Sequence, residues 1–259
     1  MKPIRVYQCE DTQEGILTAV YDAGKSRYGH EFIRLQVQNP DLQENYDLFS
    51  EYISVTTDAE KARKVEESVC SKISREAYEA VMCVIRCADA DKANVIYHFI
   101  VYGFALGAKV TDALQIPWVQ RMFEMRRKFW NEAYYFREFM RFQEIMLEHP
   151  VLFAVFEPQS RVLPEVATHF ADRLNPEWFV ILDKTHREAA FHNPDKGWYV
   201  RRLEPEECER LLELEQQKED YVDLWKAFFE TIKIQERSNP NLQRNNLPLH
   251  YRKHMPEFH

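Results

Sequence analysis

Apolar and polar positions alternate in three short segments of the first 57 residues, a pattern typical of half-buried strands. The segments are PIRVYQC (residues 3–9), FIRLQVQ (32–38) and EYISVTT (51–57). Between the first two, apolar residues recur at helical spacing, and Asp11 or Thr12 can cap that helix. The N-terminal part is therefore predicted to run strand–helix–strand–strand.

Helical periodicity dominates from residue 58 to residue 130. Helices are predicted to begin after Asp58, after Ser74 and after Asp89 or Asp91, because these residue types favour the N-cap position. Apolar residues lie on nearly every side of the third of these helices from Val95 to Leu106, so this helix is expected to be the most buried. One more helix is predicted to begin near Pro117 and to continue to about residue 139.

Strand patterns return from residue 139 and surround one further helix. A hairpin is predicted for FMRFQEIML and PVLFAVFEP, a helix for RVLPEVATHFADRL, and strands for WFVILD, REAAFHN and GWYVRRL. A long helix is predicted from Pro205 to Ile234. The fold class is thus α+β, with antiparallel sheet units, a central all-helical region and a long C-terminal helix.

This pattern divides the chain into four parts, which we expect to form one compact domain. They are an N-terminal strand–helix–strand part (1–57), a helical region (58–130), an α+β unit with the long helix (131–235) and a basic C-terminal arm (236–259).

Composition narrows the classes of function. The formal net charge is −8, so any nucleic-acid contact through phosphates requires a local basic face. Five cysteines, no apolar run after Met1 and no apolar stretch of about 20 residues predict a cytoplasmic protein with reduced thiols and no membrane contact.

Three arginines are the main candidates for anion binding. Arg137 and Arg141 are four residues apart, and Arg173 can approach them from the following helix. Guanidinium groups around one concavity can bind phosphate in bidentate fashion. The alternative is ion pairing with nearby acids, which are Glu132, Glu138, Glu157 and Asp172.

The C-terminal arm and the aromatic residues offer further nucleic-acid contacts. Arg252 and Lys253 can follow a phosphate backbone, or they can belong to a surface arm that Tyr251 and Phe258 pin to the body. Aromatic side chains can stack on bases, although their spacing also suits a protein core. These residues are Trp118, Trp130, Trp178, Trp198, Tyr134 and Tyr135.

Candidate catalytic residues are few. His169 can act as a general base or form a local hydrogen bond, and Asp183 can orient His186 or simply stabilise a turn. The histidines at 149, 186 and 192 match no metal-ligand spacing, and no phosphate loop or nucleophile motif is present. We expect no metal site and no cofactor.

Several segments in sequence order resemble one bacterial family. They are EGILTAVYDA, NEAYYFREFMRF, VLFAVFEPQSRVLPEVATHFADRL, FVILDKTHREAAFH and LPLHYRKHMPEF, and together they span nearly the whole chain. The resemblance is to the family of domain of unknown function 4130, whose members are named DNA metabolism or DNA repair proteins. Matching motif positions are Arg141, Phe142, Pro158, Leu163, Pro164, His169, Phe170, Arg173, Asp183, Tyr251, Arg252 and Phe258.

The resemblance implies a partner. In that family the protein is encoded beside a radical-SAM DNA repair or modification enzyme, an iron–sulfur protein that would supply cofactor chemistry which this chain lacks. The first hypothesis is a DNA-binding or adaptor protein for that enzyme, using Arg137, Arg141, Arg173, Arg252 and Lys253. The second is an enzyme acting on DNA or nucleotides, hydrolase-like or glycosylase-like. The third is a protein-interaction subunit without nucleic-acid contact.

Overall fold

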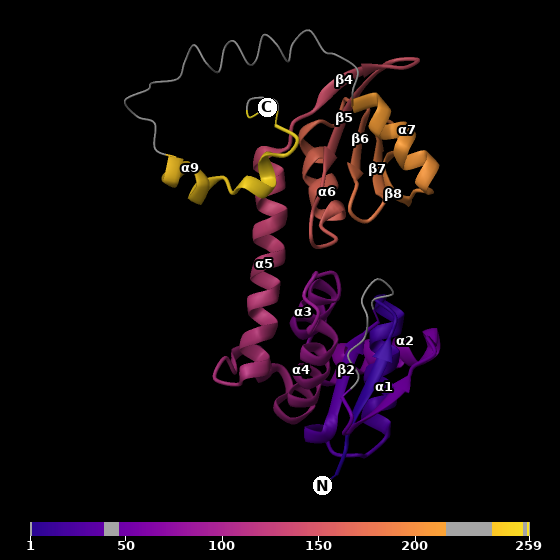
Figure 1. Ribbon diagram of the computed structural model, residues 1–259, viewed down its shortest axis with the longest axis vertical. Coiled ribbons are helices and arrows are strands. Elements are labelled where there is room, and N and C mark those ends of the chain that lie inside the picture. The colour runs from indigo at the N-terminus through magenta and orange to yellow at the C-terminus, as the bar shows by residue number, and fades with distance from the viewer. Residues whose placement is uncertain (1, 39–46, 216–239, 256–257, 259) are drawn as a thin grey trace. The chain divides into compact units, whose positions relative to one another are not determined.

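Two compact units divide the chain, residues 1–129 (unit 1) and residues 130–259 (unit 2). The computed structural model describes residues 2–38, 47–215, 240–255 and 258. Both units combine helices with a sheet, as Figure 1 shows, so the α+β class is confirmed.

The sheet of unit 1 has three strands in the order β2-β1-β3, and both neighbours run parallel to β1. The strands are β1 (Ile4–Cys9), β2 (Ile33–Val37) and β3 (Ser50–Ser54), and α1 (Gln13–Lys25) crosses between the first two. The predicted element order is correct here, but the prediction of antiparallel pairing is wrong. A helix between two strands gives the chain the length to return and run parallel, which a tight turn cannot do.

The helical region of unit 1 agrees with the periodicity. Its helices are α2 (Ala59–Lys72), α3 (Arg75–Ile85), α4 (Lys92–Leu106) and the first part of α5 (Pro117–Phe139). Among the described residues, Lys92–Asp112 is long and apolar enough to cross a membrane, a composition that core helices share. In α4, the side chains of Val95, Ile96 and Phe99 are fully buried in unit 1.

Unit 2 contains a five-stranded sheet in the order β4-β5-β6-β7-β8. Its elements after α5 are β4 (Gln143–Met146), β5 (Pro150–Phe156), α6 (Leu163–Arg173), β6 (Phe179–Asp183), β7 (Glu188–Asn193), β8 (Gly197–Arg202) and α7 (Pro205–Glu215). The predicted hairpin is confirmed as the antiparallel pair β4–β5. The described part of α7 ends at Glu215, and the rest of the predicted long helix, 216–234, lies outside the described residues.

One pair of strands in this sheet departs from the antiparallel prediction. β5 and β6 run parallel, because α6 carries the chain back between them. The loop after β5 and the turn after β6 therefore meet at the same edge of the sheet, which brings together residues 157–161 and 183–187.

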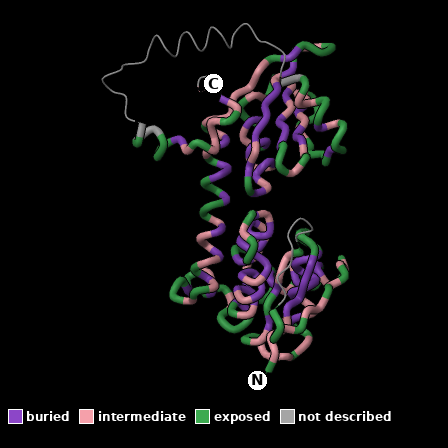
Figure 2. Tube along the Cα trace, in the orientation of Figure 1, coloured by how far each residue is buried: buried purple, intermediate pink, exposed green. Residues whose placement is uncertain are grey.

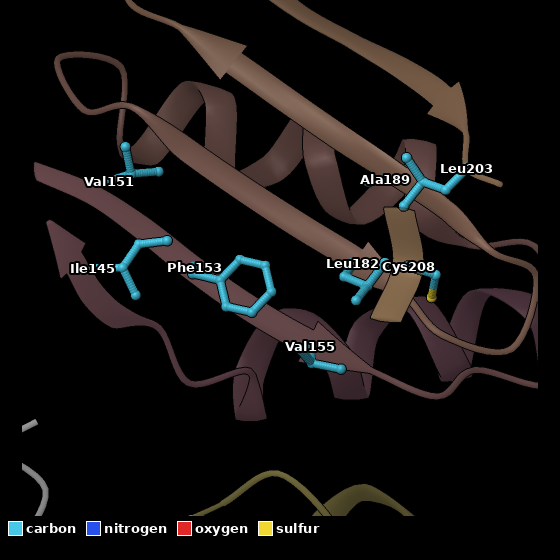
Figure 3. Packing of buried hydrophobic residues seen from close by; sticks show 8 residues of the cluster. All are labelled: Ile145, Val151, Phe153, Val155, Leu182, Ala189, Leu203 and Cys208. Atoms are coloured by element: carbon cyan, nitrogen blue, oxygen red, sulfur yellow. The ribbon is translucent and has the colours of Figure 1, made fainter. Parts of the chain in front are cut away.

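Each face of the sheet in unit 2 has its own apolar core, while β8 at its edge is mostly exposed (Figure 2). On the face that α7 covers, Phe153 and Leu182 lie in a cluster with Leu203 and Cys208 (Figure 3). On the opposite face, Phe136 of α5 lies 4.8 Å from Phe156 of β5, and Phe142, just after α5, lies 4.9 Å from Phe170 of α6, both between ring centres. This second core positions the end of α5 against α6.

The C-terminal segment packs back onto unit 2. It forms α9 (Pro240–Asn246) and a short 3-10 helix (Leu249–Arg252), which Figure 1 shows beside α5. The Tyr251 ring lies 4.9 Å from Tyr135 and 4.8 Å from Phe136 between centroids.

Candidate functional site

Two of the predicted arginines and the predicted histidine meet where α5 lies against α6. Arg137 is in the last turn of α5, and His169 and Arg173 are one turn apart near the end of α6. The Nη2 of Arg137 donates a hydrogen bond to the backbone carbonyl of Glu165, at 3.1 Å. Burial lowers the pKa of His169, and the positive charges of Arg137 and Arg173 lower it further. We call these three residues the α5–α6 basic cluster.

The cluster keeps much of its positive charge. The acceptor of Arg137 is a neutral carbonyl, and its buried Nε has no hydrogen-bond partner among the described residues. Arg173 is exposed and forms no ion pair within the part of the chain that the structure describes. Glu138 and Asp172 lie near enough to raise the pKa of His169, so two acids flank the cluster. The geometry leaves guanidinium N–H groups available for an anion.

Exposed aromatic rings adjoin the cluster along α5. The guanidinium of Arg137 lies 5.9 Å from the ring centre of Trp130. Trp130 is 43% exposed and Tyr134, one turn further along the helix, is 56% exposed. Flat rings beside a cationic group are the arrangement that stacks on nucleic-acid bases.

Arg141 has a different environment. It lies two residues after the end of α5, and its Nη1 donates to the carbonyls of Phe139 and Met140, at 3.3 and 3.5 Å. These carbonyls lie at the C-terminal end of the helix, where a cation is favourable. Arg141 thus stabilises the end of α5, two residues from the hairpin strand β4.

The structure places Arg252 within the docked tail. Its Nε and Nη2 donate to the carbonyl of Leu247, at 3.1 and 2.9 Å, and its guanidinium lies 4.6 Å from the ring centre of Phe258. Arg252 therefore closes the tail on itself. Its contacts match the alternative in which Tyr251 and Phe258 belong to an arm held on the body.

Lys253 points to a carboxylate at the edge where β5 and β6 end. Glu157 accepts hydrogen bonds from Lys253 and from Lys184, the latter at 3.2 Å, and lies 3.4 Å from Nε2 of His254. The hydrogen bond from Lys253, together with Lys184, lowers the pKa of Glu157 to about 2. From the sequence, Glu157 was expected only as a possible partner of the arginines, and nothing in the sequence indicated that two lysines share its carboxylate.

A second carboxylate is also engaged away from the arginines. Glu132 is buried in α5, and it accepts hydrogen bonds from the backbone N–H groups of Gln159 and Ser160, at 2.6 and 3.1 Å. Those amides lie in the loop between β5 and α6. Glu132 and Glu157 were both candidates to neutralise the arginine cluster, and the hydrogen bonds of each are made elsewhere.

Asp183 and His186 form a pair at the same edge. Asp183 is 0% exposed at the end of β6, and its carboxylate accepts from the backbone N–H of His186 at 3.0 Å and contacts the ring Nδ1 at 2.7 Å. An ionised aspartate in this position holds the proton on Nδ1 and leaves Nε2 as the basic nitrogen. The pair can therefore orient an imidazole for proton transfer.

Across the residues that the structure describes, no group of three or more His, Cys, Asp or Glu side chains is placed to hold a metal ion. His149 lies instead against Trp178, with 4.4 Å between ring centres, and Nδ1 of His192 is 2.8 Å from the carbonyl of Glu177.

A family model for a domain of unknown function, DUF4130, matches residues 90–257, and the chain belongs to this family. The match covers all of the α5–α6 basic cluster, the Asp183–His186 pair and the docked tail up to residue 257. A comparison with curated proteins finds no match.

Replacing Glu157 by Gln tests the carboxylate that holds the tail. The folded pKa lies below the usual 4.5, so Glu157 stabilises the protein above the unfolded pKa and loses this effect as the pH falls toward 2. We expect E157Q to lower the free energy of unfolding at pH 7 by about 1–2 kcal/mol, because partly exposed pairs are screened. Urea denaturation between pH 7 and pH 2.5 measures it.

The matched control is Glu79→Gln on α3, whose ion pair with Arg75 is exposed. We expect E79Q to change stability by less than about 0.5 kcal/mol. If the difference in free energy of unfolding between wild type and E157Q stayed constant from pH 7 down to pH 2.5, the stabilising role assigned to the ionised Glu157 carboxylate would be contradicted.

Proposed function

We propose that this protein binds nucleic acid and acts in DNA metabolism or repair as a partner of a radical-SAM iron–sulfur enzyme. The observation that carries the proposal is the α5–α6 basic cluster, in which Arg137, His169 and Arg173 converge beside exposed aromatic rings. The DNA context and the partner come from the named functions and the gene neighbourhood of the resembling family.

Phosphate is the chemical group that fits the cluster. A guanidinium offers several N–H donors in a plane and binds phosphate oxygens in pairs. The protein as a whole is anionic, with net charge −8, so long-range attraction to a polyanion is weak. Binding is then expected to depend on a small number of phosphate contacts and to have a modest salt dependence.

Bases are the second group that fits. Trp130 and Tyr134 present rings on the same stretch of α5 that carries Arg137. Stacking requires bases that are unpaired, because a duplex buries their faces. We therefore propose that the preferred ligand is single-stranded DNA or a duplex with an extruded base.

The role of the partner enzyme follows from what this chain's residues can do. In this proposal the described residues would bind an anion, orient an imidazole and present rings, and the radical chemistry would be that of an iron–sulfur cluster on the partner. In this proposal the chain presents the DNA and the partner carries out the reaction.

A second candidate function rests on the Asp183–His186 pair. A fully buried aspartate that fixes an imidazole is an arrangement used in general acid–base catalysis. It favours an enzyme that hydrolyses a bond in DNA or nucleotides, with His186 moving the proton.

Arginine substitutions test nucleic-acid binding. We expect Arg137→Ala and Arg173→Ala each to weaken binding of a single-stranded oligonucleotide, and each to lower the slope of log K against log salt by about 1. Fluorescence anisotropy between 50 and about 200 mM salt measures both quantities.

Arg75→Ala is the matched control, because Arg75 is an exposed arginine of unit 1 paired with Glu79. The affinity of R75A for the oligonucleotide, and its slope of log K against log salt, should equal those of wild type. Equal affinities for wild type, R137A and R173A would count decisively against a phosphate contact at the cluster.

Co-purification with the radical-SAM enzyme tests the partnership. We expect a complex after nuclease treatment if the two proteins touch directly, and a complex that depends on added DNA if the nucleic acid bridges them. No complex under either condition would contradict the adaptor role. If this chain binds the enzyme directly but does not bind DNA, the alternative of a protein-interaction subunit without nucleic-acid contact would be supported.

Substitutions of the Asp183–His186 pair test the second candidate. If the chain is a hydrolase, oligonucleotides incubated with it should release bases or nucleotides detectable by mass spectrometry. Asp183→Asn and His186→Gln should then lower that rate by a factor of about 100 or more, while oligonucleotide binding persists. His149→Gln, which alters a histidine beside Trp178, is the control. No release by wild type would remove this candidate.

A further inference from the structure

The outer strand of the unit 2 sheet presents an open edge. Among the described strands, β8 pairs with β7 alone. Its middle residues are accessible, with Tyr199 59% exposed and Val200 36% exposed. An unpaired edge offers a row of N–H and C=O groups that another strand can use.

The direction of each peptide group along β8 follows from the ladder. The N–H of Leu203 donates to the carbonyl of Arg187 at 2.8 Å, which makes 187 and 203 a hydrogen-bonded position of the β7–β8 pairing. Such positions recur at every second residue of an antiparallel pair. Tyr199 and Arg201 therefore bond to β7, while Trp198, Val200 and Arg202 direct their N–H and C=O groups toward the open side.

The side chains of β8 are complementary to a second copy of themselves. An antiparallel partner must bring outward-facing peptide groups opposite one another, and a register centred on Val200 does so. This register sets Tyr199 opposite Arg201 of the second copy and Trp198 opposite Arg202 of the second copy. Each pairing sets a cation beside an aromatic ring, the first on one face of the extended sheet and the second on the other.

Charges at the ends of the strand favour the same register. Lys196 precedes β8 and Glu204 follows it, and centring on Val200 sets them opposite each other. A register centred on Tyr199 would set Lys196 against Arg202, and one centred on Arg201 would set that arginine against itself. Like charges directly opposite destabilise a sheet, so both alternatives are disfavoured.

The existing contacts on this strand extend the same pattern. The Arg201 guanidinium lies 5.7 Å from the ring centre of Phe191, and Phe191 stacks on Tyr199 at 5.4 Å. Arg201 also pairs with Glu207 at 3.0 Å. Arg202 is exposed and has no ion pair within the described part of the chain. Tyr199 of the second copy would therefore add to the stack already present at Arg201. On the other face, Trp198 of the second copy would engage Arg202, which is otherwise solvated.

We propose that two copies of this chain associate along β8, antiparallel and centred on Val200, which joins their five-stranded sheets across a two-fold axis. The proposal rests on the edge of the sheet alone and does not depend on nucleic-acid binding.

Val200→Pro tests the central hydrogen bonds. Proline removes the N–H that faces the open side, and a proline on an edge strand leaves the β7–β8 ladder intact. Sedimentation velocity of the full chain should show a dimer that forms with rising concentration, and V200P should weaken it at least about tenfold, because both copies lose the bond. Circular dichroism checks that V200P keeps the wild-type fold.

A charge exchange tests the register. Lys196→Glu and Glu204→Lys should each weaken the dimer about tenfold, because the two-fold axis repeats every repulsion. The double variant restores opposite charges and should return the dissociation constant to within about threefold of wild type. Hydrogen exchange of the Val200 amide should slow as the protein concentration rises.

Two outcomes overturn the proposal. The first is a wild-type chain that stays monomeric up to several hundred micromolar. The second is a dimer that neither V200P nor the charge exchange affects, which would place the interface elsewhere. A dimer lost in each single charge variant and recovered in the double variant can arise only if Lys196 and Glu204 face each other between copies.

Discussion

The arrangement of unit 2 depends on the contact that Phe136 makes with two other rings. Its side chain lies 4.8 Å from Phe156 at the end of β5 and 4.8 Å from Tyr251 in the tail, measured between ring centres. One buried residue thus fixes the helix, the sheet and the C-terminal segment together. Arg137 is its neighbour in the chain, so the direction of the guanidinium toward α6 follows from apolar packing.

The distribution of acids determines where positive charge survives on this anionic protein. Glu132 is held by backbone amides and Glu157 by two lysines, and both interactions occur where β5 and β6 end. Both carboxylates were candidates to neutralise the arginines, and the hydrogen bonds of each are made to other donors. Positive charge therefore persists between α5 and α6, although unit 2 also contains the buried carboxylates of Glu132 and Asp183.

The sequence patterns predicted the structural features that depend on residues close together in the chain. Helical periodicity located α2 to α6, and the contact between Asp183 and His186 was foreseeable because the two residues are three positions apart in one turn. Strand direction was not foreseeable, since alternation in β5 and β6 is the same for parallel and antiparallel pairing. Nor was the pairing of Lys253 with Glu157, which are 96 residues apart and meet only through tertiary packing.

The docked tail has a consequence for how the protein is made. Ribosomes release a chain from its N-terminus onward, and domains begin to fold as they emerge. Tyr251 and Lys253 leave the exit tunnel after all the described strands of unit 2, yet they complete the packing around Phe136 and Glu157. Unit 2 must therefore wait, with one apolar surface still uncovered, until the tail that follows its sheet has emerged.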